Sequence, residues 1–118
     1  MQAGTFEYAN GVIGPDTVTA LGIVTGCQRY NRMAFTITGL TTETISVNVS
    51  FDYDPSGSGT WAAAAVRPID MATGALVAAS ALTNGTFLLV NTPWRAIRFV
   101  KTATTDPATV RWGILNAN

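Results

Sequence analysis

The clearest pattern in the chain is a strict alternation of apolar and polar residues that begins after Glu43, in the stretch ETISVNVSFD. Ile45, Val47, Val49 and Phe51 occupy every second position, and small polar residues occupy most of the positions between them. Because successive side chains of a β-strand point to opposite faces of the sheet, this pattern predicts a strand with four apolar side chains on one face.

A second alternating segment lies just upstream. Met33, Phe35 and Ile37 alternate with small residues, and Gly39 ends the run. We therefore expect another strand here. We interpret the link from residue 39 to residue 42 as a turn between two antiparallel strands.

Further strands are expected on both sides of this pair. Short apolar or β-branched segments predict strands at residues 5–8, 18–24, 61–66, 86–91, 94–101 and 109–115, and residues 75–81 fit either a strand or a short helix. Residues with turn chemistry separate them at 70–74, 84–85 and 104–108.

These elements amount to seven to nine short strands at intervals of about 8–12 residues, which is typical of all-β proteins. We predict a single-domain antiparallel β-sandwich or jelly roll, and the 118 residues are enough for one core. Residues 17–118 are assigned to this domain. Residues 1–16, which are rich in Gly and Asn and contain Gly14-Pro15, are assigned to an N-terminal arm or extension.

The composition describes a protein with few charges. Hydrophobic residues make up 47% of the chain, and seven basic and seven acidic side chains give a net charge of zero. This balance argues against a nucleic-acid partner, and a near-neutral surface favours contact with another surface. We find no signal-peptide pattern and no apolar segment of about 20 residues, so we expect synthesis in a cytoplasm and no membrane partner.

Residue types that common catalytic mechanisms need are missing from the sequence. There is no histidine, which excludes Ser-His-Asp and Cys-His catalysis and His-ligated zinc. Cys27 is the single cysteine, so no internal disulfide can form, and nothing beside it in the sequence would lower the pKa of its thiol. Asp52 and Asp54 form a carboxylate pair, but their position fits a turn. We therefore expect neither an enzyme nor a cofactor.

The stretch FDYDPSGSGTW, residues 51–61, is similar to the first half of an EF-hand calcium loop, with Asp52, Asp54 and Ser56 at alternate positions. An EF-hand, however, needs a bidentate Glu at its twelfth position, which here is Ala63, and it needs flanking helices where we expect a strand. We interpret the stretch as an exposed turn whose Asp side chains bind backbone groups. A weak calcium site at the two Asp residues is the alternative.

Aromatic and arginine side chains are the remaining candidates for binding. Trp61, Trp94, Trp112 and Tyr53 are able to stack on a sugar, but packing in the core or at an interface is the favoured interpretation. Trp112 alternates with apolar residues like a core position, and Trp94 is expected to be partly exposed. Arginine outnumbers lysine, which favours an interface because its planar group tolerates desolvation. The cationic residues are Arg29, Arg32, Arg67, Arg95, Arg98, Arg111 and Lys101.

The succession of strand and turn phrases between Met33 and Leu115 resembles a family of phage proteins. The phrases are FTITGLTTETISVNVSFD, a Gly/Ser loop followed by Trp61, IDMATGALV, LTNGTFLLV, WRAIRFVKT and ATVRWGIL. This succession is similar to that of the small β-sandwich head decoration, or cement, proteins of tailed bacteriophages. Related phrases also occur in phage tail and neck components.

The resemblance implies a non-enzymatic virion protein on the capsid surface. Such a protein is expected to bind the major capsid protein as a symmetric homo-oligomer, a trimer or a dimer, and to stabilise the shell by bridging capsid subunits. The alternatives are a tail or neck component and a carbohydrate-binding or host-adhesion module. The residues that we expect at an interface are Phe6, Tyr8, Arg29, Arg32, Trp94 and Arg95.

Overall fold

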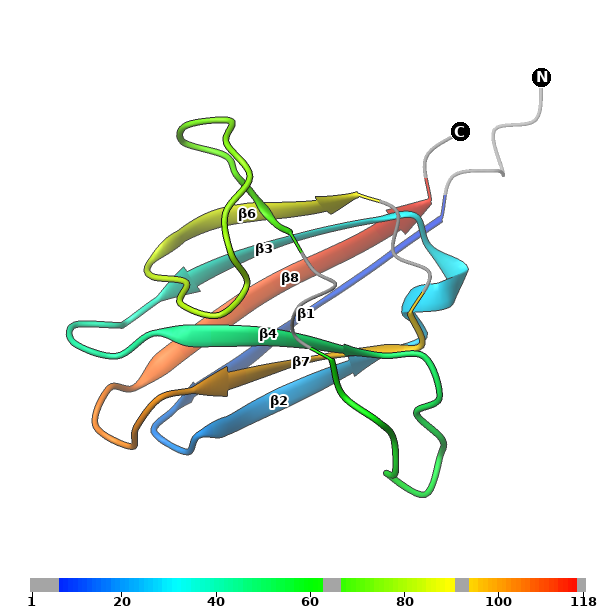
Figure 1. Ribbon diagram of the computed structural model, residues 1–118, viewed down its shortest axis with the longest axis horizontal. Coiled ribbons are helices and arrows are strands. Elements are labelled where there is room, and N and C mark those ends of the chain that lie inside the picture. Colours follow the sequence, from blue (N-terminus) through cyan, green and yellow to red (C-terminus); the bar gives the residue numbers. More distant parts are fainter. Residues whose placement is uncertain (1–6, 63–66, 91–93, 117–118) are drawn as a thin grey trace.

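The computed structural model describes residues 7–62, 67–90 and 94–116, and its regular elements are β-strands apart from one short helical turn (Figure 1). The strands are β1 (Glu7–Asp16), β2 (Ala20–Thr25), β3 (Arg32–Thr38), β4 (Ile45–Ser50), β5 (Ile69–Asp70), β6 (Gly85–Val90), β7 (Ala96–Lys101) and β8 (Ala108–Asn116). The turn is the 3-10 helix η2 (Cys27–Arg29). None of the helical residues in these ranges forms a segment long and apolar enough to cross a membrane.

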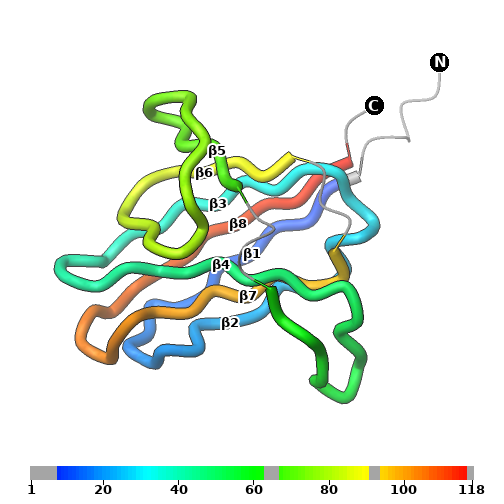
Figure 2. The backbone as a smooth tube through the Cα atoms, viewed as in Figure 1, coloured from blue at the N-terminus to red at the C-terminus, as the bar shows by residue number. Residues whose placement is uncertain are grey.

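Two antiparallel sheets make up a β-sandwich. One sheet has the strand order β1-β8-β3-β6-β5, and the other has the order β2-β7-β4. The strands β1 to β4 alternate between the two sheets, and so do β6, β7 and β8, as in a jelly roll. The tube in Figure 2 shows the chain passing repeatedly from one layer to the other. The predicted all-β sandwich or jelly roll is confirmed.

The link between β3 and β4 is not a hairpin turn. β3 pairs with β6 and β8, whereas β4 pairs with β7 in the other sheet. The expectation of a turn between two paired antiparallel strands is therefore wrong. Each of these strands has one apolar face, and in a sandwich the two faces cover each other from opposite layers.

The core lies between the sheets and contains the alternating positions that the sequence indicated. These positions, at most 1% exposed, are Met33, Phe35, Ile37, Ile45, Val47 and Val49. The ring centroid of Phe35 lies 5.5 Å from that of Phe87 in the same sheet and 5.1 Å from that of Phe99 in the other. Phe51 departs from the predicted alternation and is 60% exposed, because β4 ends at Ser50.

β1 occupies most of the segment that we expected to form an arm over residues 1–16. Residues 7–16 pair with β8, with a register shift after Ile13. Ala9 and Ile13 face inward and pack against the core, so this segment has the same alternation as the other strands. β1 therefore belongs to the sandwich, and the arm assignment does not hold for it. Residues 1–6 lie outside the described residues.

Four of the other predicted strands agree with the structure apart from their ends. Segments 18–24, 86–91, 94–101 and 109–115 correspond to β2, β6, β7 and β8. Within the predicted strand at 61–66, Ala62 forms an isolated bridge with Val49 of β4, and residues 63–66 lie outside the described part of the chain.

The ambiguous segment at residues 75–81 forms neither a strand nor a helix. It runs beside β4, where the N–H of Val47 donates to the carbonyl of Ala79 at 2.8 Å. Leu82 then forms a bridge with Ile45. Ala79 of this segment and Leu82 just after it are buried against the core, whereas Leu76 is exposed.

Candidate interaction surface

The side of the five-stranded sheet that faces away from the core combines apolar residues with polar and cationic ones. Because side chains alternate along each strand, every second residue of β1, β8, β3 and β6 points outward, and the strand register aligns these residues in rows. The rows are Tyr8, Leu115, Arg32 and Val90; Asn10, Gly113, Ala34 and Leu88; and Val12, Arg111, Thr36 and Thr86. We call these residues the outer face.

A shallow groove lies over β1, β8 and β3 on the outer face. Its floor includes Ala34 and Gly113, whose small size leaves a cavity of about 380 Å³ that also borders Tyr8 and Leu115. Tyr8 is 67% exposed, and Val90 at the far end of the first row is 46% exposed. A contiguous apolar patch on an isolated chain marks a site of interaction more often than a single exposed apolar residue does.

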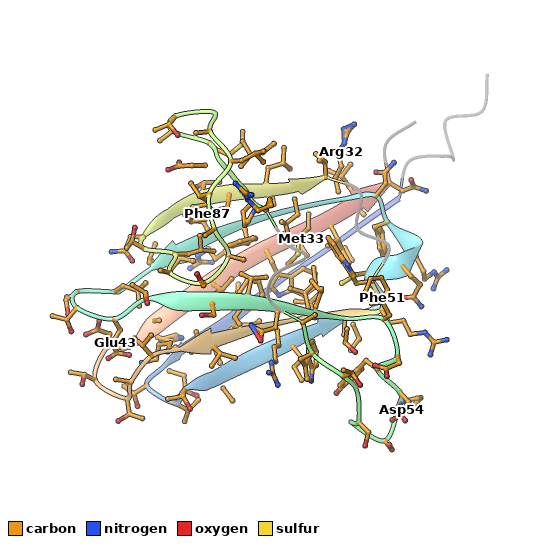
Figure 3. The ribbon with its side chains drawn as sticks, viewed as in Figure 1. Arg32, Met33, Glu43, Phe51, Asp54 and Phe87 are labelled. Carbon is orange, nitrogen blue, oxygen red and sulfur yellow. The ribbon has the colours of Figure 1, made fainter. Side chains whose placement is uncertain are left out.

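Both charged residues of the outer face are arginines. Arg32 and Arg111 are exposed, and none of the residues that define this face is acidic. Figure 3 shows Arg32 directed away from the body of the sandwich. In the third row the hydroxyl groups of Thr36 and Thr86 form a hydrogen bond of 2.9 Å. The outer face therefore combines apolar contact area with positive charge.

The structure separates the residues that we expected at an interface. Tyr8 and Arg32 lie on the outer face. Arg29 lies in η2 and Arg95 lies just before β7; both are exposed, and neither belongs to the rows of the outer face. Phe6 lies outside the described residues. The expected set therefore does not form one continuous surface.

The tryptophans do not form a common platform. Trp94, expected to be partly exposed and at an interface, is 7% exposed and packs in the core, so its ring is not a surface group of this chain. Trp112 faces inward from β8 and packs against the core. Trp61 lies with its ring centroid 5.5 Å from that of Tyr53, and the guanidinium carbon of Arg98 lies 4.6 Å from the Trp61 ring centroid.

The carboxylates of Asp52 and Asp54 organise the loop after β4. Oδ1 of Asp54 accepts hydrogen bonds from the N–H and hydroxyl of Ser56 and from the N–H of Ser58. Oδ1 of Asp52 accepts one from the N–H of Thr60 at 2.8 Å. These bonds lower the pKa of each carboxyl group. The largest contribution comes from the Ser56 hydroxyl for Asp54 and from the Thr60 N–H for Asp52.

The loop is therefore a turn whose Asp side chains bind backbone groups, as the sequence indicated. Within the described ranges, no group of three or more His, Cys, Asp or Glu side chains is arranged to hold a metal ion.

A second cavity, of about 340 Å³, lies beside this loop. It is bordered by Thr25, Gly26, Gln28, Tyr53, Asp54, Pro55 and Arg95, and we call it the loop pocket. Three segments that are distant in the sequence meet there: the end of β2 with η2, the loop after β4, and the residue before β7. Figure 3 shows Asp54 on the projecting loop, away from Arg32.

A buried ion pair joins the β3–β4 link to the β7–β8 link. Nζ of Lys101 lies 2.5 Å from Oε1 of Glu43, and Oε2 of Glu43 accepts hydrogen bonds from the N–H groups of Thr105 and Asp106. The carboxylate of Asp106 in turn accepts hydrogen bonds from the N–H and hydroxyl of Thr41 and from the next two N–H groups. We call Glu43, Lys101 and Asp106 the polar clasp.

Hydrogen bonds favour the ionised form of both carboxyl groups in the polar clasp. Burial alone would raise the pKa of Glu43, but the hydrogen bonds from Lys101 and from two backbone N–H groups lower that pKa below its usual range. The hydroxyl and N–H of Thr41, together with the N–H of Glu43, lower the pKa of Asp106 well below its usual range.

The polar clasp was not recognised from the sequence, although a signal exists there. Glu43 and Lys101 continue the inward-facing positions of β4 and β7, and Lys101 lies opposite Ile45 in the register. A charged residue at an inward position requires a partner, because an unpaired charge is costly to bury. The sequence therefore indicates that each charge needs a partner, and the pairing of β4 with β7 brings the two together.

Cys27 is a buried thiol. Its Sγ lies 3.4 Å from the carbonyl oxygen of Val24, to which it donates. Burial raises the pKa of this thiol to about 11. The group therefore has little thiolate character at neutral pH.

Comparisons with known proteins find similarity in structure alone. No family model matches the chain, and no curated protein matches its sequence. The crystal structure of the SPBc2 prophage-derived protein YomS is similar with a TM-score of 0.70 at 13% identity, over 94% of this chain and 95% of that chain. The PBSX exported protein XepA is similar with a TM-score of 0.73 at 10% identity, over 98% of this chain and 39% of that chain.

A third solved structure is more distant. The carbohydrate-binding module of endoglucanase Cel5A from Eubacterium cellulosolvens has a TM-score of 0.45 at 9% identity, over 93% of this chain and 99% of that chain. The first two similarities establish that this chain shares the β-sandwich fold of YomS and of part of XepA. The TM-score of the third structure is too low to support any inference.

Proposed function

We propose that this protein is a non-enzymatic structural protein of a phage virion that binds the outer surface of the capsid. The observation that carries the proposal is the outer face, where an apolar groove bordered by the exposed Tyr8 lies beside two exposed arginines. Apolar area flanked by arginine is typical of the surfaces through which proteins bind other proteins.

The fold supports the phage context of the proposal. YomS is a prophage-derived protein, and the similarity extends over nearly the whole of both chains. This agrees with the resemblance of the strand and turn phrases between Met33 and Leu115 to those of phage head decoration proteins. Because one fold serves many functions, the role within the virion rests on the outer face and not on the fold.

The charge of the outer face favours the partner that we propose, the major capsid protein, over a second copy of the same face. Arg32 and Arg111 suit bidentate contact with carboxylates and tolerate partial loss of water. Two outer faces packed together would bring like charges into proximity, which disfavours that pairing. The capsid surface that binds here is therefore apolar with acidic residues at its margin, and contacts between copies of this chain use other surfaces.

Repetition around a capsid symmetry axis would convert modest contacts into stable attachment. A symmetric homo-oligomer, trimer or dimer, presents the outer face two or three times, so that each further contact becomes intramolecular once the first has formed. Bridging neighbouring capsid subunits in this way would stabilise the shell against the pressure of packaged DNA.

The test is co-sedimentation of the purified protein with expanded, undecorated capsids of its phage, followed by imaging of the bound shells. We expect saturable binding at symmetry-related sites and greater resistance of the shells to heat. An absence of binding to capsids would refute the capsid role. Binding to isolated tails or necks instead would identify the protein as a component of those parts.

Two variants with the same added charge locate the contact. Ala34→Arg fills the groove of the outer face, and Ile23→Arg places the same side chain at an exposed position of β2 in the other sheet. We expect Ala34→Arg to abolish binding and Ile23→Arg to retain it, with both proteins folded by circular dichroism. Equal binding by the two variants would show that the outer face is not the contact surface.

A further inference from the structure

The loop pocket has one aromatic wall that its neighbours hold in place. Tyr53 is half-buried, and the centroid of its ring lies 5.5 Å from the centroid of the Trp61 ring. Trp61 in turn lies under the guanidinium group of Arg98, which also donates a hydrogen bond to Asn48 of β4 at 3.3 Å. The Tyr53 ring is therefore positioned before any ligand binds, which reduces the entropy that binding would cost.

Other residues that line the loop pocket supply polar groups of both kinds. The three hydrogen bonds that the described residues donate to the Asp54 carboxylate all reach Oδ1, so within those residues Oδ2 is available as an acceptor. Arg95 supplies donors, and its backbone is held at both ends: its N–H donates to Ser50 at 2.8 Å, and its carbonyl accepts from Cys27 at 3.3 Å. Gln28 adds an amide that both donates and accepts.

We propose that the loop pocket binds a neutral sugar residue of a surface glycan. One face of the sugar ring lies on Tyr53, and adjacent hydroxyl groups donate to Asp54 and accept from Arg95. A sugar matches this arrangement because its hydroxyl groups are donors and acceptors on neighbouring carbon atoms, while its C–H groups form a face that suits the electron-rich face of an aromatic ring. The cavity volume lies within the range of small-molecule sites.

The same groups disfavour other classes of ligand. An anion would be attracted by Arg95 but repelled by Asp54, whose hydrogen bonds favour its ionised form. A cation would be attracted by Asp54 but repelled by Arg95. An apolar ligand would leave both charged groups desolvated without partners. This binding function is separate from the proposed capsid contact, since the outer face and the loop pocket share no residue.

The test is a titration of the ¹⁵N-labelled full chain with glucose, galactose and N-acetylglucosamine, followed by oligosaccharides of the monomer that binds. We expect saturable shifts of the Gly26, Asp54 and Arg95 amide signals, with millimolar affinity for a single sugar. Sodium phosphate and sodium acetate at matched ionic strength serve as charged probes. An absence of shifts at these amides with all three sugars, or saturation there by an anion instead, would overturn the proposal.

Variants connect the shifts to the groups named. Arg95→Ala removes an exposed side chain while it keeps the backbone hydrogen bonds, and we expect affinity to fall by about tenfold or more. Tyr53→Phe keeps the aromatic wall and should retain most of the affinity, whereas Tyr53→Leu should lose it. Tyr8→Ala on the outer face is the control and should bind like the parent protein. Unchanged affinity in both Arg95→Ala and Tyr53→Leu would refute the site.

Discussion

The ammonium group of Lys101 lies 2.5 Å from a carboxylate oxygen of Glu43, and both side chains are almost completely removed from solvent. The other oxygen of Glu43 binds the N–H groups of Thr105 and Asp106, so that each end of the pair has further partners. This pair connects the link that crosses between the sheets after β3 to the link between β7 and β8. The polar clasp therefore joins two links that cross between the layers.

Removing one charge of the pair should destabilise the fold more than removing both. Glu43→Gln keeps the shape of the side chain but leaves the ammonium group of Lys101 buried without a counter-charge. We expect a lower urea midpoint for Glu43→Gln and partial recovery in the double variant Glu43→Gln with Lys101→Met, measured by circular dichroism. A midpoint of Glu43→Gln equal to that of the parent would contradict this account of the clasp.

Acid should weaken the fold through the same clasp. The pKa values of Glu43 and Asp106 are lowered in the folded protein, so the unfolded chain takes up protons first as pH falls. The stability that these groups contribute is fully present above their usual pKa of about 4 and decreases as pH falls below it toward the folded values. Urea midpoints between pH 7 and pH 2.5 should show this decrease.

Asp106→Asn tests the origin of the acid sensitivity, because it removes the proton-linked group with little change of size. We expect this variant to be less stable at pH 7 and to have a flatter pH dependence. Asp16→Asn is the matched control, since Asp16 accepts one exposed hydrogen bond from Val18. If Asp16→Asn and Asp106→Asn gave the same pH profile, the clasp would not be the acid-sensitive element.

The two phenylalanines at positions 35 and 51 should differ strongly in their contribution to stability. Phe35 is 1% exposed between the layers, so Phe35→Ala should lower the free energy of unfolding by about 3–5 kcal/mol. Phe51 lies beyond the end of β4, and Phe51→Ala should change the free energy of unfolding by less than about 0.5 kcal/mol. Chemical unfolding monitored by tryptophan fluorescence measures the free energy of unfolding of both variants. Similar losses of stability in the two would argue against the observed end of β4.

Two glycines on adjacent strands should respond differently to the same added methyl group. A Cβ at Gly11 would lie 2.7 Å from Cζ2 of Trp112, whereas a Cβ at Gly113 would meet nothing closer than 3.9 Å. Gly11→Ala should therefore displace the indole and cost about 1–3 kcal/mol. Gly113→Ala should change stability by less than about 1 kcal/mol. Thermal unfolding compares the two variants. Equal stability would show that the Trp112 indole moves aside without a loss of stability.

The thiol of Cys27 should be unreactive in the folded protein. With a pKa raised to about 11, only about 0.1% of the group is thiolate at pH 8, and the side chain is fully buried. We expect iodoacetamide to modify the native protein far more slowly than the same protein in urea, as followed by mass spectrometry. Comparable rates in the two conditions would mean that the thiol is accessible.

The sequence by itself indicated six of the eight described strands, β2, β3, β4, β6, β7 and β8, and which faces of β3 and β4 are buried. Alternation is a local property with a period of two, so Met33 to Ile37 and Ile45 to Val49 could be read directly as inward-facing runs. It also indicated the turn around Asp54, because short polar side chains bind nearby backbone groups wherever the strand ends.

Only the tertiary structure decided which strands pair and what the loops bring together. Pairing depends on contacts between distant segments, so the β3–β4 link that suggested a hairpin crosses the sandwich instead, and residues 7–16 join β8 at the other end of the chain. The loop pocket needs three such segments, and the outer face needs the register of four strands. Local alternation determines which face of a strand is buried, whereas its neighbouring strands are determined by the burial of the whole core.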